Sequence, residues 1–166
     1  MDKIEEERLK NMLAGGVIDK ATVFGLLVSE FRREYGDGAL KVAKKAAYKR
    51  GYALGTRVRK YMEEKGRNIN DLLVVRSSFA ETSGSTAHRK DLVTDEKKLE
   101  YEITHCPWVA AWKEAGFSAE EIGVFCDVMS ESDRALPEGI NPKIQLKNDQ
   151  GLGKGKAVCR VTWEIK

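Results

Sequence analysis

The spacing of apolar residues changes part-way along the chain, and this change limits the fold more than any other feature of the sequence. Before about residue 82, apolar residues recur every three or four positions, which is typical of helices with one buried face. From residue 92 onward, the segments 99–105 and 157–165 alternate apolar and polar residues, which is typical of half-buried strands. The sequence therefore predicts an α+β fold, in which an N-terminal helical layer packs on a small antiparallel sheet with two inserted helices.

The helical half, residues 1–82, is predicted to contain four helices. Gly15-Gly16 is expected to end the first helix, and Asp19 is expected to cap the second. The third helix covers about residues 39–65, and the fourth ends near Thr82. These helices form the layer that is expected to cover the sheet.

A row of small residues marks one face of the predicted third helix. Ala47, Gly51 and Gly55 recur four residues apart, so all three lie on the same side. Glycine inside a helix costs about 1 kcal/mol relative to alanine. The row therefore predicts that a helix or a ligand approaches this backbone closely, and close helix packing is the simpler interpretation.

The mixed half, residues 92–166, is predicted to hold three strands and the two inserted helices. Pro107 ends a strand and opens the first of these helices, and Ser118 with Glu121 forms a capping box for the second. The segment 83–90, which joins the two halves, is predicted to be a polar loop with a solvated His88. The predicted strands are 99–105, 142–148 and 157–165.

Composition supports one folded domain, residues 1–166, and excludes several classes of protein. Hydrophobic residues make up 42% of the chain, which is enough to build a packed core. The 29 basic residues are interleaved with 26 acidic ones, and this balance argues against nucleic acid as a partner. Three cysteines without a CxxC pair argue against a secreted disulfide scaffold.

The sequence also predicts a soluble, cytoplasmic protein with no membrane partner. The first ten residues are mostly charged, unlike a signal peptide. The longest apolar run, Val23 to Val28, has six residues, far fewer than the roughly 20 that span a bilayer.

Cys106 is the first candidate for chemistry, because it lies where a strand gives way to a helix. A thiol at a helix N-terminus has a lowered pKa and becomes more nucleophilic. His105 is its neighbour, but adjacent residues of a strand point in opposite directions, so their adjacency does not imply a Cys–His pair. The alternative is a core cysteine beside a histidine at the end of a strand.

Cys126 and Cys159 are predicted to face the interior, where a core role is the simpler interpretation of each. The three cysteines nevertheless lie on three elements of the mixed half, and we expect them to converge. A three-thiolate zinc site with His105 or Asp127 as the fourth ligand stays open. Sequence separations of 20 and 33 residues are not a metal-binding signature, so the metal ligands cannot be assigned.

The second half of the chain resembles a known family. The strings HCPWVAAWKEAG, FCDVMSESD, INPKI and VCRVTWEI are together similar to the L-2-amino-thiazoline-4-carboxylic acid hydrolase family, over residues 99–166. The turn 150–156 departs from the family pattern, so the resemblance leaves the exact substrate open. The matching positions are Cys106-Pro107, Trp112, Gly116, Cys126, Asp127, Asp133, Asn141-Pro142 and Cys159.

The resemblance implies a hydrolase that opens a small cyclic amidine carboxylate, such as 2-aminothiazoline-4-carboxylate, to an N-carbamoyl product. The catalytic residues would then be Cys106 as nucleophile, Asp127 as amidinium ligand or base, and His105 as a further base. Arg50, Arg57 or amides near Trp108 would hold the substrate carboxylate. The residues expected to border the substrate are Trp108, Cys126, Asn141 and Cys159.

The organisation of the chain is also similar, at the level of the fold, to small-molecule-binding domains of the 4-vinyl-reductase and Golgi transport-particle type. This second resemblance implies a homodimer, and in some sensor members a cysteine-rich zinc site. The rival to the hydrolase is therefore a non-catalytic small-molecule-binding or zinc-structured sensor module. Bound zinc, and ring opening with and without a chelator, would separate the two.

Overall fold

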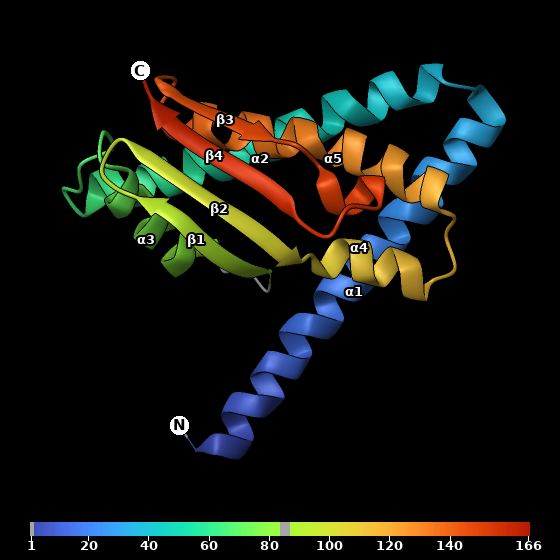
Figure 1. Ribbon diagram of the computed structural model, residues 1–166, viewed down its shortest axis with the longest axis horizontal. Helices are drawn as coiled ribbons and strands as arrows, with labels where there is room; N and C mark the ends of the chain where they lie inside the picture. Colours follow the sequence, from blue (N-terminus) through green and yellow to red (C-terminus); the bar gives the residue numbers. More distant parts are fainter. Residues whose placement is uncertain (1, 84–86) are drawn as a thin grey trace.

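The computed structural model describes residues 2–83 and 87–166, and in this part of the chain three helices precede a four-stranded sheet with two helices inserted between its strands (Figure 1). The α+β class predicted from the sequence is confirmed. The elements are α1 Lys3–Tyr35, α2 Gly38–Glu64, α3 Leu72–Ser83, β1 His88–Thr94, β2 Lys98–His105, α4 Pro107–Glu114, α5 Ala119–Ile140, β3 Ile144–Asn148, the short 3₁₀ helix η1 Gly151–Lys154, and β4 Cys159–Ile165.

The sheet is antiparallel throughout, with the strand order β1-β2-β4-β3. The three predicted strands are present as β2, β3 and β4. In the central pair, Tyr101 lies opposite Val161 and Ile103 lies opposite Cys159. Tyr101, Val161 and Cys159 are buried, so this face of the sheet turns toward the helices, as the alternation in the sequence predicts.

The described part of the sheet has one strand more than predicted, because β1 starts within the last three residues of the segment 83–90 that was expected to be a loop. His88 therefore lies on a strand and not in a loop, while residues 84–86 of that segment lie outside the described residues. β1 is an edge strand with mostly exposed side chains, so burial imposes no apolar alternation on its sequence. A register shift between Asp91 and Val93 disturbs the pattern further.

α1 is one continuous helix, so the predicted break at Gly15-Gly16 and the predicted cap at Asp19 are wrong. The helix begins after Asp2, whose side chain accepts a hydrogen bond from the Glu5 amide at 2.8 Å. It ends at Gly36, which adopts a positive φ of 68°. Two glycines cost about 2 kcal/mol of helix propensity, and this is too little to break a helix of 33 residues whose C-terminal half is packed.

The N-terminal half of α1 extends away from the other elements (Figure 1). Among the described helices, α1 alone is long and apolar enough to cross a membrane. Its apolar residues do not form one uninterrupted run in the sequence, because Asp19 and Lys20 divide them. Core helices of soluble proteins can have the same length and composition, so the cytoplasmic location stays a prediction. The exposed apolar residues of α1 include Ile4, Leu9, Met12, Leu13, Val23, Leu27 and Phe31.

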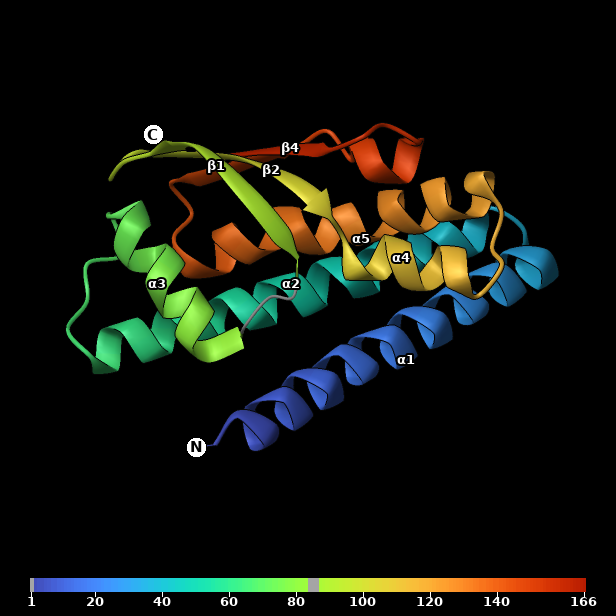
Figure 2. The same cartoon turned by 60° about the horizontal axis from the view of Figure 1, so that its bottom comes forward.

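α2 and α5 pack side by side with their backbones in contact (Figure 2). A methyl group on Gly51 would overlap the backbone of Ser132, and one on Gly55 would lie 2.9 Å from the Cα of Gly139. These contacts confirm that the small-residue row is a helix-packing face, because a side chain at either glycine would push the helices apart.

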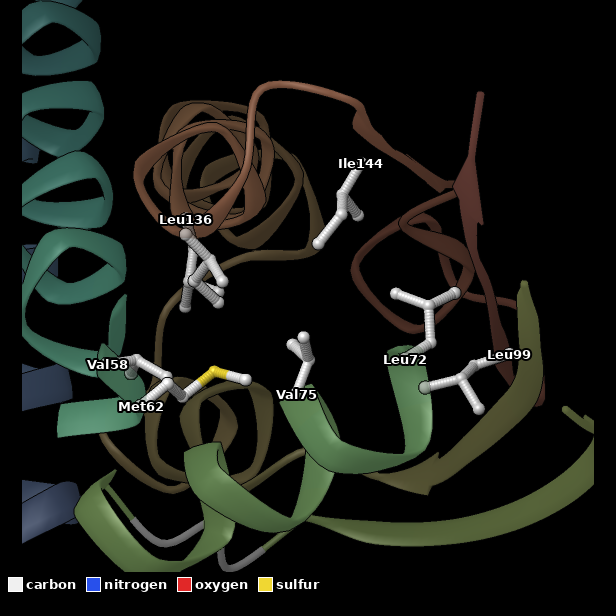
Figure 3. Packing of buried hydrophobic residues seen from close by; sticks show 8 residues of the cluster. Val58, Met62, Leu72, Val75, Leu99, Leu136 and Ile144 are labelled. Carbon is white, nitrogen blue, oxygen red and sulfur yellow. The ribbon is translucent and has the colours of Figure 1, made fainter. Parts of the chain in front are cut away.

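Two apolar clusters hold the layers together. One joins α2, α3, α5 and the sheet, and it contains the fully buried Met62 and Val75 (Figure 3). The other joins α1, α4 and α5 around Trp112 and Phe125. The indole nitrogen of Trp112 donates a hydrogen bond of 2.7 Å to the carbonyl of Ala21, which fixes α4 against α1. The candidate site lies between these two clusters.

Candidate functional site

A cavity of about 680 Å³ lies between the helices and the inner face of the sheet, and we call it the thiol cavity. All three cysteines line it, and so does Trp108 at the start of α4. A cavity of this volume falls in the range of pockets that bind small molecules. Its wall includes Lys20, Arg50, Arg57, Phe79, Ile103, Cys106, Trp108, Cys126, Asp133, Leu136, Asn148 and Cys159.

The three thiols converge as expected, and each is brought to the cavity by a different element. Cys106 is the N-cap of α4, Cys126 lies on α5, and Cys159 begins β4. Gly153 of η1 packs so closely on Cys126 that a methyl group there would overlap the sulfur. The amide of Leu152 donates to the Cys159 sulfur at 3.2 Å. The glycine-rich turn therefore holds two of the thiols in place.

Burial raises the pKa of all three thiols, which corrects the expectation of a lowered pKa at Cys106. The amides of Trp108 and Val109 at the start of α4 do favour the Cys106 thiolate, as predicted. Removal of Cys106 from water outweighs them, so its pKa rises. Burial, reinforced by the two neighbouring thiols, raises the pKa of Cys126 to about 12.

Alkylation of the native protein with iodoacetamide near neutral pH is expected to modify Cys106 before Cys126. The thiolate is the reacting form, and Cys106 has two helix amides that offset part of its burial, whereas the pKa of Cys126 is about 12. Peptide mapping at increasing times gives the order of modification. The unfolded protein in denaturant is the control, in which the thiols should react at similar rates. Faster labelling of Cys126 would contradict this role for the α4 amides.

Asp133, and not Asp127, supplies the carboxylate of the thiol cavity. Asp127 is exposed and forms an ion pair with Lys44. The difference follows from helix geometry, because Asp133 lies seven residues after Cys126 and returns to the same face of α5, whereas Asp127 is turned by about 100°. The spacing of seven residues is a signal in the sequence that identifies Asp133.

The environment of Asp133 makes it an ionisable group near neutral pH. Removal from water raises its pKa from the ordinary 3.8 to about 6, and this outweighs the opposing effects of Asn148 and Arg50. The amide of Asn148 donates a hydrogen bond of 3.3 Å to its carboxylate. By its accessible surface Asp133 is exposed, but its side chain lines two cavities, so protein atoms surround a carboxyl group that water can still reach. A carboxyl group of this kind is suited to general acid–base chemistry.

Positive charge lies on the α1 and α2 side of the cavity. Arg50 and Arg57, the expected ligands of a substrate carboxylate, both line the cavity together with Lys20. The guanidinium of Arg50 also donates to the hydroxyl of Ser132 at 2.8 Å, which holds it close to α5. The cavity thus has a carboxylate on one wall and guanidinium groups on another.

The structure places His105 and Asn141 outside the described wall of the cavity. His105 is exposed at the end of β2, with its ring 4.9 Å from that of His88 on the neighbouring strand. Asn141 is buried at the end of α5, where its amide donates to the carbonyl of Ile69 at 3.0 Å and to the side chain of Asn70 at 3.1 Å. Asn141 therefore links α5 to the segment before α3, which is a structural task.

No described group of three or more histidine, cysteine, aspartate or glutamate side chains is arranged to hold a metal ion. The three thiols face one cavity without forming a ligand set. The zinc site that the sequence leaves open thus has no candidate ligand set within residues 2–83 and 87–166.

Comparison with known proteins identifies a family whose matched region contains the thiol cavity. The model of the L-2-amino-thiazoline-4-carboxylic acid hydrolase family matches residues 17–163. The chain belongs to this family. The match includes Asp133 and all three cysteines, and the wall of the thiol cavity, from Lys20 to Cys159, lies entirely within it. Comparison with curated proteins finds no match.

Among solved structures, a trafficking protein particle complex subunit 3 from Naegleria fowleri, covalently bound to palmitic acid, is similar to this chain. The TM-score is 0.54 at 13% sequence identity, and the similarity covers 91% of this chain and 95% of that chain. At this identity the similarity establishes the fold alone. It agrees with the transport-particle architecture expected from the sequence.

Proposed function

We propose that this protein is a hydrolase that opens a small cyclic amidine carboxylate, of the 2-aminothiazoline-4-carboxylate type, to an N-carbamoyl product. One observation carries the proposal: a single cavity brings together the Cys106 thiol, the Asp133 carboxyl group and the guanidinium groups of Arg50 and Arg57. These are the nucleophile, the base and the anion-binding groups that such a reaction requires. Membership of the hydrolase family supports it.

The substrate is expected to bind between the two charged walls. Asp133 takes the role that the sequence assigned to Asp127, and its carboxylate pairs with the positive amidine. Arg50 or Arg57 pairs with the substrate carboxylate, for which the planar guanidinium is well matched. Trp108 packs against Phe24 with ring centroids 5.8 Å apart, and it forms an apolar wall beside the ring.

The reaction then proceeds through the sulfur of Cys106. Asp133 accepts the thiol proton as the sulfur forms a bond to the amidine carbon. The bond between this carbon and the ring sulfur breaks, and the ring sulfur leaves as a thiolate that takes up a proton. Water adds to the same carbon, the bond to Cys106 breaks, and the N-carbamoyl cysteine product is released. Overall, one water molecule is consumed and no oxidant is needed.

Ring opening by the purified protein tests the proposal. The product is detected by mass spectrometry after incubation with 2-aminothiazoline-4-carboxylate. Acid quenching during turnover should trap an adduct that increases the protein mass by one intact substrate, because the first step is an addition, and peptide mapping should locate it on Cys106. His105→Gln is the matched control, and it should retain both the product and the adduct.

Two outcomes would count against parts of the scheme. Product formed without any adduct, and retained in Cys106→Ala, would show that water attacks the substrate directly. The absence of product with wild-type protein would overturn the hydrolase itself. The alternative of a non-catalytic small-molecule-binding or zinc-structured sensor module is not favoured, because the chain belongs to the hydrolase family. The homodimer stays a prediction that sedimentation can test.

A further inference from the structure

A second cavity, of about 170 Å³, adjoins the thiol cavity, and we call it the side chamber. It lies between α3, α5 and the inner face of the sheet. The two cavities share five wall residues, so they adjoin one another there, and we call this border the junction. The shared residues are Phe79, Ile103, Asp133, Leu136 and Asn148.

The remaining walls of the side chamber are mostly apolar. They include Val75 of α3, Leu146 of β3 and Trp163 of β4. Val75 points toward Leu136 of α5 across the core (Figure 3). The indole nitrogen of Trp163 donates a hydrogen bond of 3.2 Å to the hydroxyl of Tyr101, so these two polar groups are already paired with each other.

The two arginines of the side chamber are engaged elsewhere. Arg76 donates to Asp91 on β1 at 2.8 Å, and the guanidinium of Arg89 lies 5.4 Å from the centre of the Tyr101 ring. The polar groups that remain, Asp133 and Asn148, lie at the junction with the thiol cavity. The side chamber is therefore a mostly apolar space with a carboxylate at its border with the thiol cavity.

The volume of the side chamber sets the size of its occupant. An apolar cavity of about 150 Å³ is sufficient to bind benzene, and the side chamber has about 170 Å³. The unsubstituted thiazoline carboxylate offers no apolar group to fill this space. An apolar pocket of this size beside a reaction site accommodates a substituent of about six carbons.

We propose that the substrate carries an apolar substituent about the size of a phenyl ring on its amidine nitrogen, and that the side chamber binds this substituent. The inference rests on the proposed function, because it places the amidine at Asp133. Since Asp133 forms the junction, a substituent on the amidine nitrogen is the one that enters the side chamber. The substrate class is thus N-substituted 2-aminothiazoline carboxylates, and ring opening gives N-substituted carbamoyl products.

Calorimetric titration with 2-aminothiazoline-4-carboxylate and its N-benzyl derivative tests the inference. The N-benzyl compound is expected to bind roughly 10- to 100-fold more tightly, from burial of one aromatic ring. Leu146→Trp fills the side chamber and should remove this gain while leaving the unsubstituted compound unaffected. Gln145→Trp adds the same side chain to an exposed position of the same strand, and it should keep the gain. Leu146→Phe replaces the tryptophan variant if that protein does not fold.

Toluene tests the side chamber without the amidine. It should raise the melting temperature of wild type and of Gln145→Trp by about 2–4 °C at about five times its dissociation constant, and leave Leu146→Trp unchanged. Stabilisation by toluene without binding of either thiazoline would overturn the proposed function but leave the chamber as a binding site. Turnover of the unsubstituted compound with no gain from the benzyl group would overturn the substrate class inferred here. No effect of any compound would overturn both.

Discussion

Gly51→Ala is expected to destabilise the folded protein by about 3 kcal/mol or more, or to prevent folding. The added methyl group would overlap the backbone of Ser132 on α5, and a backbone atom cannot rotate away as a side chain can. Overpacking of a well-packed contact typically costs 1–3 kcal/mol, and a clash with backbone lies at the upper end or beyond. Urea unfolding followed by circular dichroism measures the loss.

Gly15→Ala is the matched control for this prediction. Both glycines lie inside helices, but a methyl group on Gly15 would meet no described atom within 4 Å. The control should gain about 0.5–1 kcal/mol, because alanine has the higher helix propensity. A Gly51→Ala protein as stable as wild type would show that α2 and α5 can separate without cost.

Asp133→Asn is expected to lower the rate of ring opening by about 10²–10⁴-fold and, at neutral pH, to make the protein more stable. The activity falls because an amide cannot accept the proton. The stability rises because the carboxylate is held in an environment that raises its pKa to about 6, so its ionised form is disfavoured in the folded state. Asparagine keeps a carbonyl oxygen for the amide of Asn148. Asp127→Asn, which alters an exposed ion pair, should leave the activity unchanged.

The difference in stability between Asp133→Asn and wild type is expected to change with pH. A carboxyl group whose pKa is higher in the folded state favours folding at pH values below its unfolded pKa, near 3.8. That contribution is lost as the pH rises to about 6, so the stability advantage of Asp133→Asn should grow over this interval. Wild-type activity should rise over the upper part of the same interval, as the base ionises. Melting temperatures and initial rates between pH 4 and 7 test both trends, and a constant difference in melting temperature would contradict the raised pKa.

Much of the fold follows from the sequence because burial imposes a period on apolar residues. The central strands β2 and β4 and the packing face at Gly51 and Gly55 could be predicted for this reason. β1 could not, since an exposed edge strand carries charged residues that resemble a loop. The break predicted at Gly15-Gly16 failed because propensity is a weak local effect, which the rest of α1 overrides.

The site was predicted less completely than the fold. The three cysteines could be placed together from their inward phase on three elements. The sequence placed Asp127 at the site through its proximity to Cys126, whereas the structure places Asp133 on the cavity wall, because the phase of the helix decides which side chain faces the cavity. The pKa of Cys106 was misjudged because its sequence reveals the helix amides but not the depth of burial.

The contact between α2 and α5 has a consequence for how a ligand enters. Two helices whose backbones touch, with glycine at the contact, interlock and cannot slide past one another without large steric cost. They form the rigid floor of the thiol cavity, from which Arg50 and Asp133 project. Any movement that widens the cavity is therefore expected in its other walls, of which α3 contributes Phe79 and Thr82 and α1 contributes Lys20. We expect ligand exchange to depend on the mobility of these walls, while the backbone contact keeps the parts of α2 and α5 that carry Arg50 and Asp133 at a fixed separation.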